Sequence, residues 1–96
     1  MTGLSGSPTH GVRLEVMLDE DASTTERAVY RGRLFEPGTS REVEAIATKD
    51  GVELRLDPDD EALRKSATAL VRAATRAELT AGEAAPRKIV RWRDKQ

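Results

Sequence analysis

The last third of the chain concentrates the side chains with the clearest chemical potential. Residues 87–95 carry five Arg or Lys, a single Asp and Trp92. Cations along an extended strand can contact phosphates, and an aromatic ring can stack on a base. The same pattern suits an amphipathic strand in which Val90 and Trp92 face the core and the arginines face the opposite side. We favour this second interpretation.

A second basic group lies in the helix-like segment that comes before. Lys65, Arg72 and Arg76 fall within about 40° of one another on a helical wheel of 100° per residue. Such a row can follow phosphates or contact an acidic protein. Cations in the later part of a helix also complement its macrodipole, and Glu61 can pair with Lys65. A solvated helix face is therefore the simpler interpretation.

Small residues form a strip beside these cations. The strip consists of Ala62, Ser66, Ala69 and Ala73. Small side chains allow another helix to approach closely, which would suit a homodimer or a groove for a partner. The strip also agrees with the high helix propensity of Ala on a partly covered flank. Both interpretations stay open.

The sequence offers little for catalysis or metal binding. The chain has no Cys, and its one His, His10, lies in a predicted leader. The acidic runs at residues 19–21 and 57–61 lack the ligand spacing of an EF-hand loop. The hydroxyl side chains have no nearby base, and the glycines fit neither a phosphate loop nor a dinucleotide fingerprint. We therefore expect no catalytic residue, no metal site and no cofactor.

Charge is divided unevenly along the chain. Residues 1–63 contain seven Lys or Arg and fourteen Asp or Glu, a net of −7, whereas residues 64–96 contain nine and three, a net of +6. The two parts sum to the overall charge of −1. This split predicts either an interaction surface for an acidic partner or nucleic acid, or two parts that neutralise each other in the fold.

Length and composition indicate one small domain. The 96 residues, 38% of them hydrophobic, can bury a single modest core. We expect a leader at residues 1–11, a domain at 12–93 and a frayed tail at 94–96. Neither a signal peptide nor an apolar run of membrane-spanning length is visible, so we expect a cytoplasmic protein. The abundance of Arg and Ala suggests a bacterial source.

Alternating apolar residues predict a four-stranded meander. Period-two patterns cover residues 12–18, 27–35, 41–48 and 52–56. Turns are expected at Glu36-Pro37-Gly38-Thr39 and at Asp50-Gly51. A polar loop connects the first two strands.

The turns also predict a register for these strands. The Pro37-Gly38 turn sets Arg31 opposite Glu44 and Arg33 opposite Glu42, with the apolar residues on the other face. The Asp50-Gly51 turn sets Ala47 opposite Leu54 and Ala45 opposite Leu56. Both turns place the apolar residues of their strands on one face, which supports the meander.

A helix and a fifth strand complete the predicted fold. Asp57 is the expected N-cap, Pro58 the first helical residue and Gly82 the C-cap. The apolar stripe consists of Leu63, Ala67, Leu70, Ala74 and Ala77, with Val71 at its edge. Residues 88–93 form the last strand. The fold class is α+β, a four-stranded antiparallel meander with one helix packed on one face and a fifth strand beside the first, in the order 5-1-2-3-4.

These observations favour a small non-enzymatic protein-interaction module, with a homodimer as one form of it. The residues expected to contact a partner are Lys65, Arg72, Arg76, Arg91, Arg93, Ala62, Ala69 and Ala73. A nucleic-acid-binding protein is the alternative. A small enzyme or accessory subunit with a pocket near Tyr30 and Trp92 is the second alternative. Neither a membrane nor a small-molecule ligand is indicated.

Overall fold

Residues 11–93 form five strands and one helix in the predicted order. The computed structural model describes residues 11–93, so the tail at 94–96 and the leader, Gly11 excepted, lie outside the described residues. The elements are β1 (Val12–Leu18), β2 (Arg27–Glu36), β3 (Thr39–Thr48), β4 (Gly51–Asp57), α1 (Glu61–Ala81) and β5 (Lys88–Arg93). Neighbouring strands are antiparallel in the order β4-β3-β2-β1-β5, which confirms the predicted topology.

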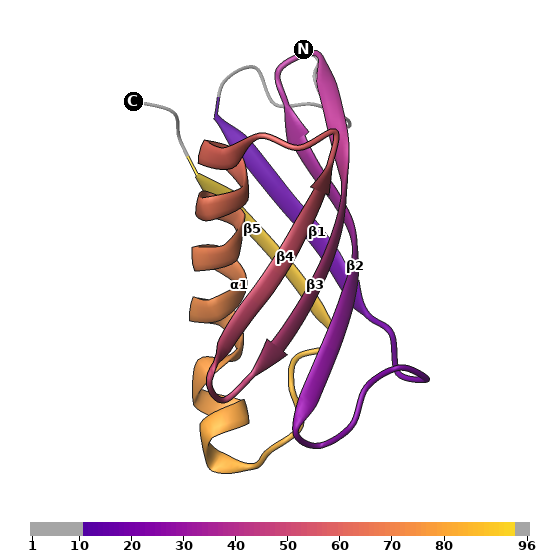
Figure 1. Cartoon of the computed structure of the whole chain (residues 1–96), viewed down its shortest axis with the longest axis vertical. Helices are drawn as coiled ribbons and strands as arrows, with labels where there is room; N and C mark the ends of the chain where they lie inside the picture. Colours follow the sequence, from indigo (N-terminus) through magenta and orange to yellow (C-terminus); the bar gives the residue numbers. More distant parts are fainter. Residues whose placement is uncertain (1–10, 94–96) are drawn as a thin grey trace.

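The sheet curls around one side of α1 (Figure 1). The helix packs mainly on β4 and β3 and makes fewer contacts with β5, so it lies along the opening between the two edge strands. The space between sheet and helix holds the core, which includes Leu14, Val16, Tyr30, Leu34, Val43, Ala45, Ala67, Val71 and Ile89. The other face of the sheet, called the outer face below, carries most of the charged residues of the strands.

A glycine allows β1 and β2 to approach closely. A Cβ atom added to Gly32 would lie 2.1 Å from the carbonyl oxygen of Glu15 and 2.7 Å from the Cα of Val16. Both atoms belong to backbone, so neither can move aside without shifting β1. The close approach of the two strands therefore depends on Gly32.

The pairing of β2 with β3 follows the predicted register. Arg31 lies opposite Glu44 and Arg33 opposite Glu42. Both pairs form ion pairs, at 3.4 Å and 3.9 Å, on the outer face. The two-residue loop at Pro37-Gly38 thus sets the register as its sequence indicates.

The turn between β3 and β4 lies one residue earlier than predicted. Thr48 pairs with Gly51, so the loop residues are 49 and 50 rather than 50 and 51. The Thr48 hydroxyl accepts a hydrogen bond from the Asp50 amide at 3.2 Å, which closes the turn at this point. The predicted Ala47–Leu54 pair is therefore wrong by two residues, a shift that leaves every side chain on its predicted face.

Asp60, not Asp57, is the N-cap of α1. The Asp60 backbone is extended, and its carboxylate accepts a hydrogen bond from the Leu63 amide at 3.0 Å. Asp57 is the last residue of β4, where it lies opposite Glu42 of β3, because the pairing of these two strands continues to this residue. The helix consequently begins after Pro58, and the Asp57–Pro58 peptide bond is cis.

The buried stripe of α1 differs in part from the predicted one. The buried residues are Ala67, Val71, Thr75 and Leu79, each four positions after the last. Ala77 is exposed, because the helix crosses the sheet obliquely and its buried face moves around the axis. The Thr75 hydroxyl donates to the carbonyl of Val71 at 2.8 Å, which makes its burial tolerable. Gly82 ends the helix in the left-handed conformation, as predicted.

The last strand presents the opposite face to the one expected. Ile89 is its buried residue, whereas Trp92 is 60% exposed on the outer face and Val90 lies on the same face. The Tyr30 hydroxyl donates a hydrogen bond of 2.6 Å to the carbonyl of Pro86, which fixes the chain just before β5. The prediction that Val90 and Trp92 point inward is therefore wrong.

Candidate interaction surface around Trp92

Five residues with large nonpolar parts lie together on the outer face of β5, β1 and β2. They are Arg13, Met17, Phe35, Val90 and Trp92, and we call them the Trp92 surface. Trp92 is 60% exposed and Met17 is 59% exposed. These two are the exposed large hydrophobic side chains of residues 11–93. A nonpolar group of this kind on the outside of a small domain commonly marks an interaction site.

Arg13 joins the two aromatic rings of this surface. The sheet register places Arg13 directly between Trp92 on β5 and Phe35 on β2. Its guanidinium carbon lies 4.5 Å from the centre of the Phe35 ring and 5.3 Å from the centre of the Trp92 ring. Cation–π contacts at these distances hold all three side chains in place.

The hydrogen-bonding capacity of Arg13 is not used up by this stack. Its Nε atom is buried without a hydrogen-bond partner, and within residues 11–93 no carboxylate forms an ion pair with it. A guanidinium donates hydrogen bonds in its own plane, whereas rings stack on its faces. Arg13 can therefore bind a carboxylate or phosphate while it remains stacked.

The fold does not neutralise the positive part of the chain with the negative part. Within the described range, three ion pairs join the two parts: Arg64–Asp59, Lys65–Glu61 and Arg87–Glu20. The first two join near neighbours in sequence, and the third is long, at 3.9 Å. Most of the acidic residues that are paired have partners among the arginines of β2, β3 and β4. The positive charge of α1 and β5 thus stays largely uncompensated.

The predicted contact residues divide into two groups in the structure. Arg91 and Arg93 lie on the helix side of β5, opposite Leu14 and Val12, and both are exposed because α1 does not cover this end of the strand. The Arg91 guanidinium donates to the carbonyl of Val90 at 2.9 Å.

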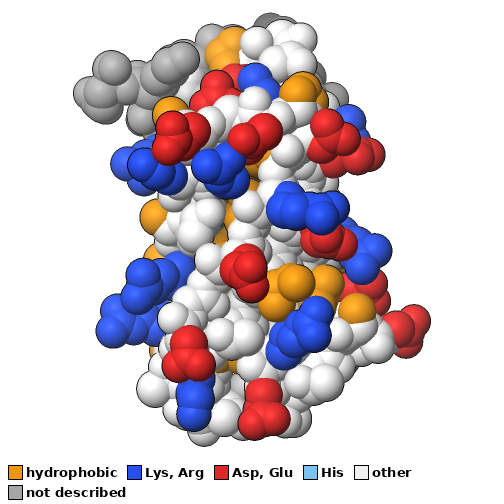
Figure 2. All heavy atoms as spheres, in the orientation of Figure 1, with side chains coloured by type: hydrophobic (Ala, Val, Ile, Leu, Met, Phe, Trp, Pro, Cys, Tyr) orange, Lys and Arg blue, Asp and Glu red, His pale blue; other side chains and the backbone are white. Residues whose placement is uncertain are grey.

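The helix cations form the second group, on the solvent side of α1. Lys65 pairs with Glu61 at 3.5 Å, as predicted. Arg72 and Arg76 are exposed, and neither has an ion-pair partner in the part of the chain that the structure describes. Figure 2 shows positive side chains along the margin that α1 occupies in Figure 1.

The small residues of the predicted strip are also exposed. Ala62, Ala69 and Ala73 lie on the solvent side of the helix, and Ser66 is half-buried. A shallow hollow of about 470 Å³ continues this strip past Ala73 to Ala81.

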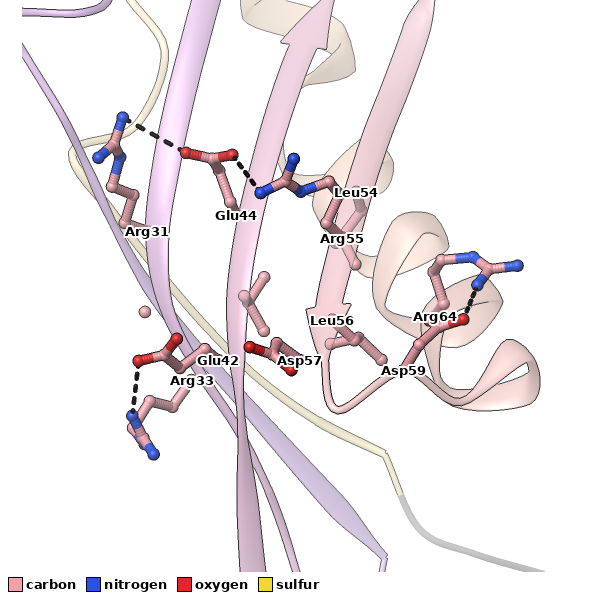
Figure 3. Close-up of a pocket in the computed structure, with 12 residues that line it drawn as sticks. Arg31, Arg33, Glu42, Glu44, Leu54, Arg55, Leu56, Asp57, Asp59 and Arg64 are labelled. Carbon is pink, nitrogen blue, oxygen red and sulfur yellow. Dashed lines mark hydrogen bonds and ion pairs between the residues drawn. The ribbon is translucent and has the colours of Figure 1, made fainter.

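A larger groove of about 760 Å³ crosses the outer face of β2, β3 and β4 (Figure 3). Arginines and acidic residues alternate across the strands along its sides. Glu44 lies between Arg31 and Arg55, with ion pairs of 3.4 Å and 3.6 Å. The four arginines of the lining are matched by four acidic residues. The groove therefore favours neither an anion nor a cation.

Tyr30 and Trp92 cannot line one pocket. Tyr30 is fully buried in the core, whereas Trp92 lies on the outer face. Burial, with a smaller contribution from the charge of Glu78, raises the pKa of Tyr30 from 10.0 to about 12. Within residues 11–93, the two side chains lie on opposite faces of the sheet.

Two further kinds of feature are absent from residues 11–93. Residues 11–93 contain no cluster of three or more potential metal ligands. In that same part of the chain, no helix combines the length and the hydropathy needed to cross a membrane. No protein-family model matches the chain, and comparisons with curated proteins and with solved structures gave no match.

Proposed function

We propose that this protein is a small non-enzymatic interaction module that binds an acidic protein segment through β5 and the Trp92 surface. The observation that carries this proposal is the exposed Trp92 with Arg13 stacked beside it. Trp, Arg and Met are enriched at protein interfaces, and the first two dominate binding hot spots.

The charge around this surface favours an acidic partner. Lys88 lies on the same face as Trp92, and Arg91 and Arg93 lie on the other side of the same strand. None of the three has an ion-pair partner within residues 11–93. Cations that remain unpaired attract an oppositely charged segment and orient it as it approaches.

A protein segment suits this surface better than nucleic acid does. Glu15 lies between Val90 and Arg33 in the row next to the aromatic stack. It would repel a nucleic-acid backbone, which carries a phosphate at every nucleotide, whereas a peptide can present a neutral residue at this point. Met17 extends the nonpolar area beyond the rings and offers no stacking platform.

Tryptophan fluorescence gives a direct test, because Trp92 is the sole tryptophan. The probes are a six-residue peptide of alternating Glu and Val, the same peptide with Lys in place of Glu, and a twelve-nucleotide oligothymidine. We expect a saturable change with the acidic peptide alone. Arg13→Met keeps the stem between the rings but removes the cation that holds Trp92 in place, so it should weaken binding at least tenfold, whereas Arg55→Met on β4 should not.

Two results would overturn the proposal. Tight, strongly salt-dependent binding of the oligothymidine would make the surface a nucleic-acid site. Failure of the acidic peptide to bind at low salt would show that the Trp92 surface does not recognise acidic segments.

A further inference from the structure

β5 has a free edge whose outward backbone groups can be identified. The amide of Leu18 donates to the carbonyl of Arg87 at 2.8 Å, so this pair is hydrogen-bonded across β1 and β5. Bonded and non-bonded pairs alternate in an antiparallel ladder. Lys88, Val90 and Trp92 therefore direct their amides and carbonyls away from β1, towards the open edge.

A second observation agrees with this assignment. The guanidinium of Arg91 donates a hydrogen bond to the Val90 carbonyl at 2.9 Å. This contact agrees with a Val90 carbonyl that points away from β1. β5 pairs with β1 alone among the described strands. Backbone groups exposed in this way can pair with an added strand.

The helix covers β5 less than it covers β4. Arg64 lines the groove next to Leu54 and Leu56 of β4, so its flank of α1 faces β4. At 100° per residue, the opposite flank carries Ser66, Leu70 and Ala74, which are half-buried. Ala73 and Ala77 lie on the solvent side of α1 and are exposed.

We infer that the acidic segment binds as an added strand on the edge of β5. This inference rests on the proposed function and specifies its geometry. Along β5, Arg91 and Arg93 face the helix side, whereas Val90 and Trp92 face outward. Side chains of an added strand lie next to those of β5 on the same face. The partner is thus an extended segment in which acidic and nonpolar residues alternate.

The same charges disfavour a second copy of β5 as the occupant. Two β5 strands placed edge to edge would bring arginines and lysines of one copy beside those of the other. Like charges directly across a strand pair destabilise it. Charge complementarity therefore selects a foreign acidic strand over self-pairing at this edge.

The test compares three acidic peptides of equal length and composition, followed by Trp92 fluorescence and amide hydrogen exchange. The first alternates Glu and Val, and the second groups its three Glu before its three Val. The third is the alternating peptide with every second backbone amide methylated. It is made in two versions, one methylated at the odd-numbered amides and one at the even-numbered amides. We expect the alternating peptide to slow exchange of the Lys88, Val90 and Trp92 amides at least tenfold. The grouped peptide and one methylated version should bind at least tenfold more weakly.

Matched variants locate the contact. Arg91→Thr with Arg93→Thr should weaken binding of the alternating peptide at least tenfold, whereas Arg72→Thr with Arg76→Thr on the helix should leave its binding unchanged.

Equal binding of all three peptides, or unchanged exchange at the β5 edge, would overturn strand addition while leaving recognition of an acidic segment intact. If no acidic peptide binds, the proposed function itself is wrong. Growth of the wild-type protein's mass with concentration, together with slowed exchange of the Lys88, Val90 and Trp92 amides in the absence of any peptide, would identify a second copy as the occupant.

Discussion

Arg13 shows how one side chain can serve both packing and recognition. Its stem and guanidinium fill the space between Trp92 and Phe35, which fixes two rings that would otherwise move freely in solvent. Because the rings contact the faces of the guanidinium, its edge stays available for an acidic group. A rigid aromatic pair and a positioned cation are a favourable starting point for binding, since less side-chain entropy is lost.

Tyr30 makes stability depend on pH in the alkaline range. Its pKa is 10.0 in an unfolded chain and about 12 in the fold, because the buried phenolate is disfavoured. A raised pKa stabilises the folded state fully below pH 10, and this contribution is lost as the pH rises through about 12. At 1.36 kcal/mol per pKa unit, the loss is roughly 2–3 kcal/mol.

Denaturant unfolding of the wild type and of Tyr30→Phe at pH 7, 10 and 12 tests this. The variant should be less stable by about 0.5–1.5 kcal/mol at pH 7, because the Pro86 carbonyl loses its donor. That difference should shrink or reverse by pH 12. A constant difference across the range would show that Tyr30 titrates normally.

At the scale of residues, the sequence could predict that Tyr30 is buried but not that Trp92 is exposed. Alternation along β5 identifies two faces without saying which one meets the core. One face of β5 has two apolar residues, Val90 and Trp92, and the other has only Ile89. The pattern therefore predicts, wrongly, that the first face is buried. The face is decided by pairing with β1, where Ile89 lies opposite the buried Val16. This information is non-local, so the Trp92 surface could not be found from the strand alone.

At the scale of elements, local chemistry places the turns and caps to within a few residues. The run Asp57-Pro58-Asp59-Asp60 contains three side chains able to cap a helix. The sheet decides among them, because β4 continues through Asp57. Asp59 instead pairs with Arg64, which leaves Asp60 to bond the Leu63 amide. The sequence therefore predicts that a cap exists, whereas its position depends on the neighbouring strand.

Two matched variants distinguish the caps. Asp60→Ala should lower the free energy of unfolding by about 1 kcal/mol, because an amide of the first turn loses its acceptor. Asp57→Ala should change it by less than about 0.5 kcal/mol, since Asp57 is exposed and makes no cap. Chemical denaturation at pH 7 measures both. An equal or larger effect of Asp57→Ala would contradict the observed helix start.

At the scale of the whole molecule, charge segregation persists after folding. Three of the six acidic residues in the strands, Glu36, Glu42 and Glu44, are paired within the sheet, whereas the cations of β5 face solvent on both sides of an open edge. Sheet edges are prone to pair with other sheets, and charged side chains on the edge prevent this. In the proposed function, the cations of β5 would have two effects, since they would repel copies of the same strand and attract acidic ones.

Removing these cations should change the state of assembly. The triple variant Lys88→Thr, Arg91→Thr and Arg93→Thr keeps the strand propensity of β5 but leaves its edge uncharged. We expect it to form larger assemblies than the wild type at equal concentration, because edge pairing is no longer opposed. Sedimentation velocity at low salt gives the comparison.

The helix supplies the control for this experiment. Lys65→Thr, Arg72→Thr and Arg76→Thr remove the same number of charges from a surface without free backbone groups. This variant should sediment like the wild type. Assemblies of equal size in both variants would show that net charge, rather than the β5 edge, governs association.

The register of β1 and β5 also determines how the domain responds to mechanical force. Val12 begins β1 and lies opposite Arg93, which ends β5, so the described chain enters and leaves the sheet at the same point. A pull on the two ends would act across the first pair of the ladder rather than along the strands. The hydrogen bonds between β1 and β5 would then break one after another, as in a zipper, instead of resisting together in shear. A domain tethered at both ends in this way would open from β5 at low force, and it would lose the edge proposed to bind a partner before it lost its core.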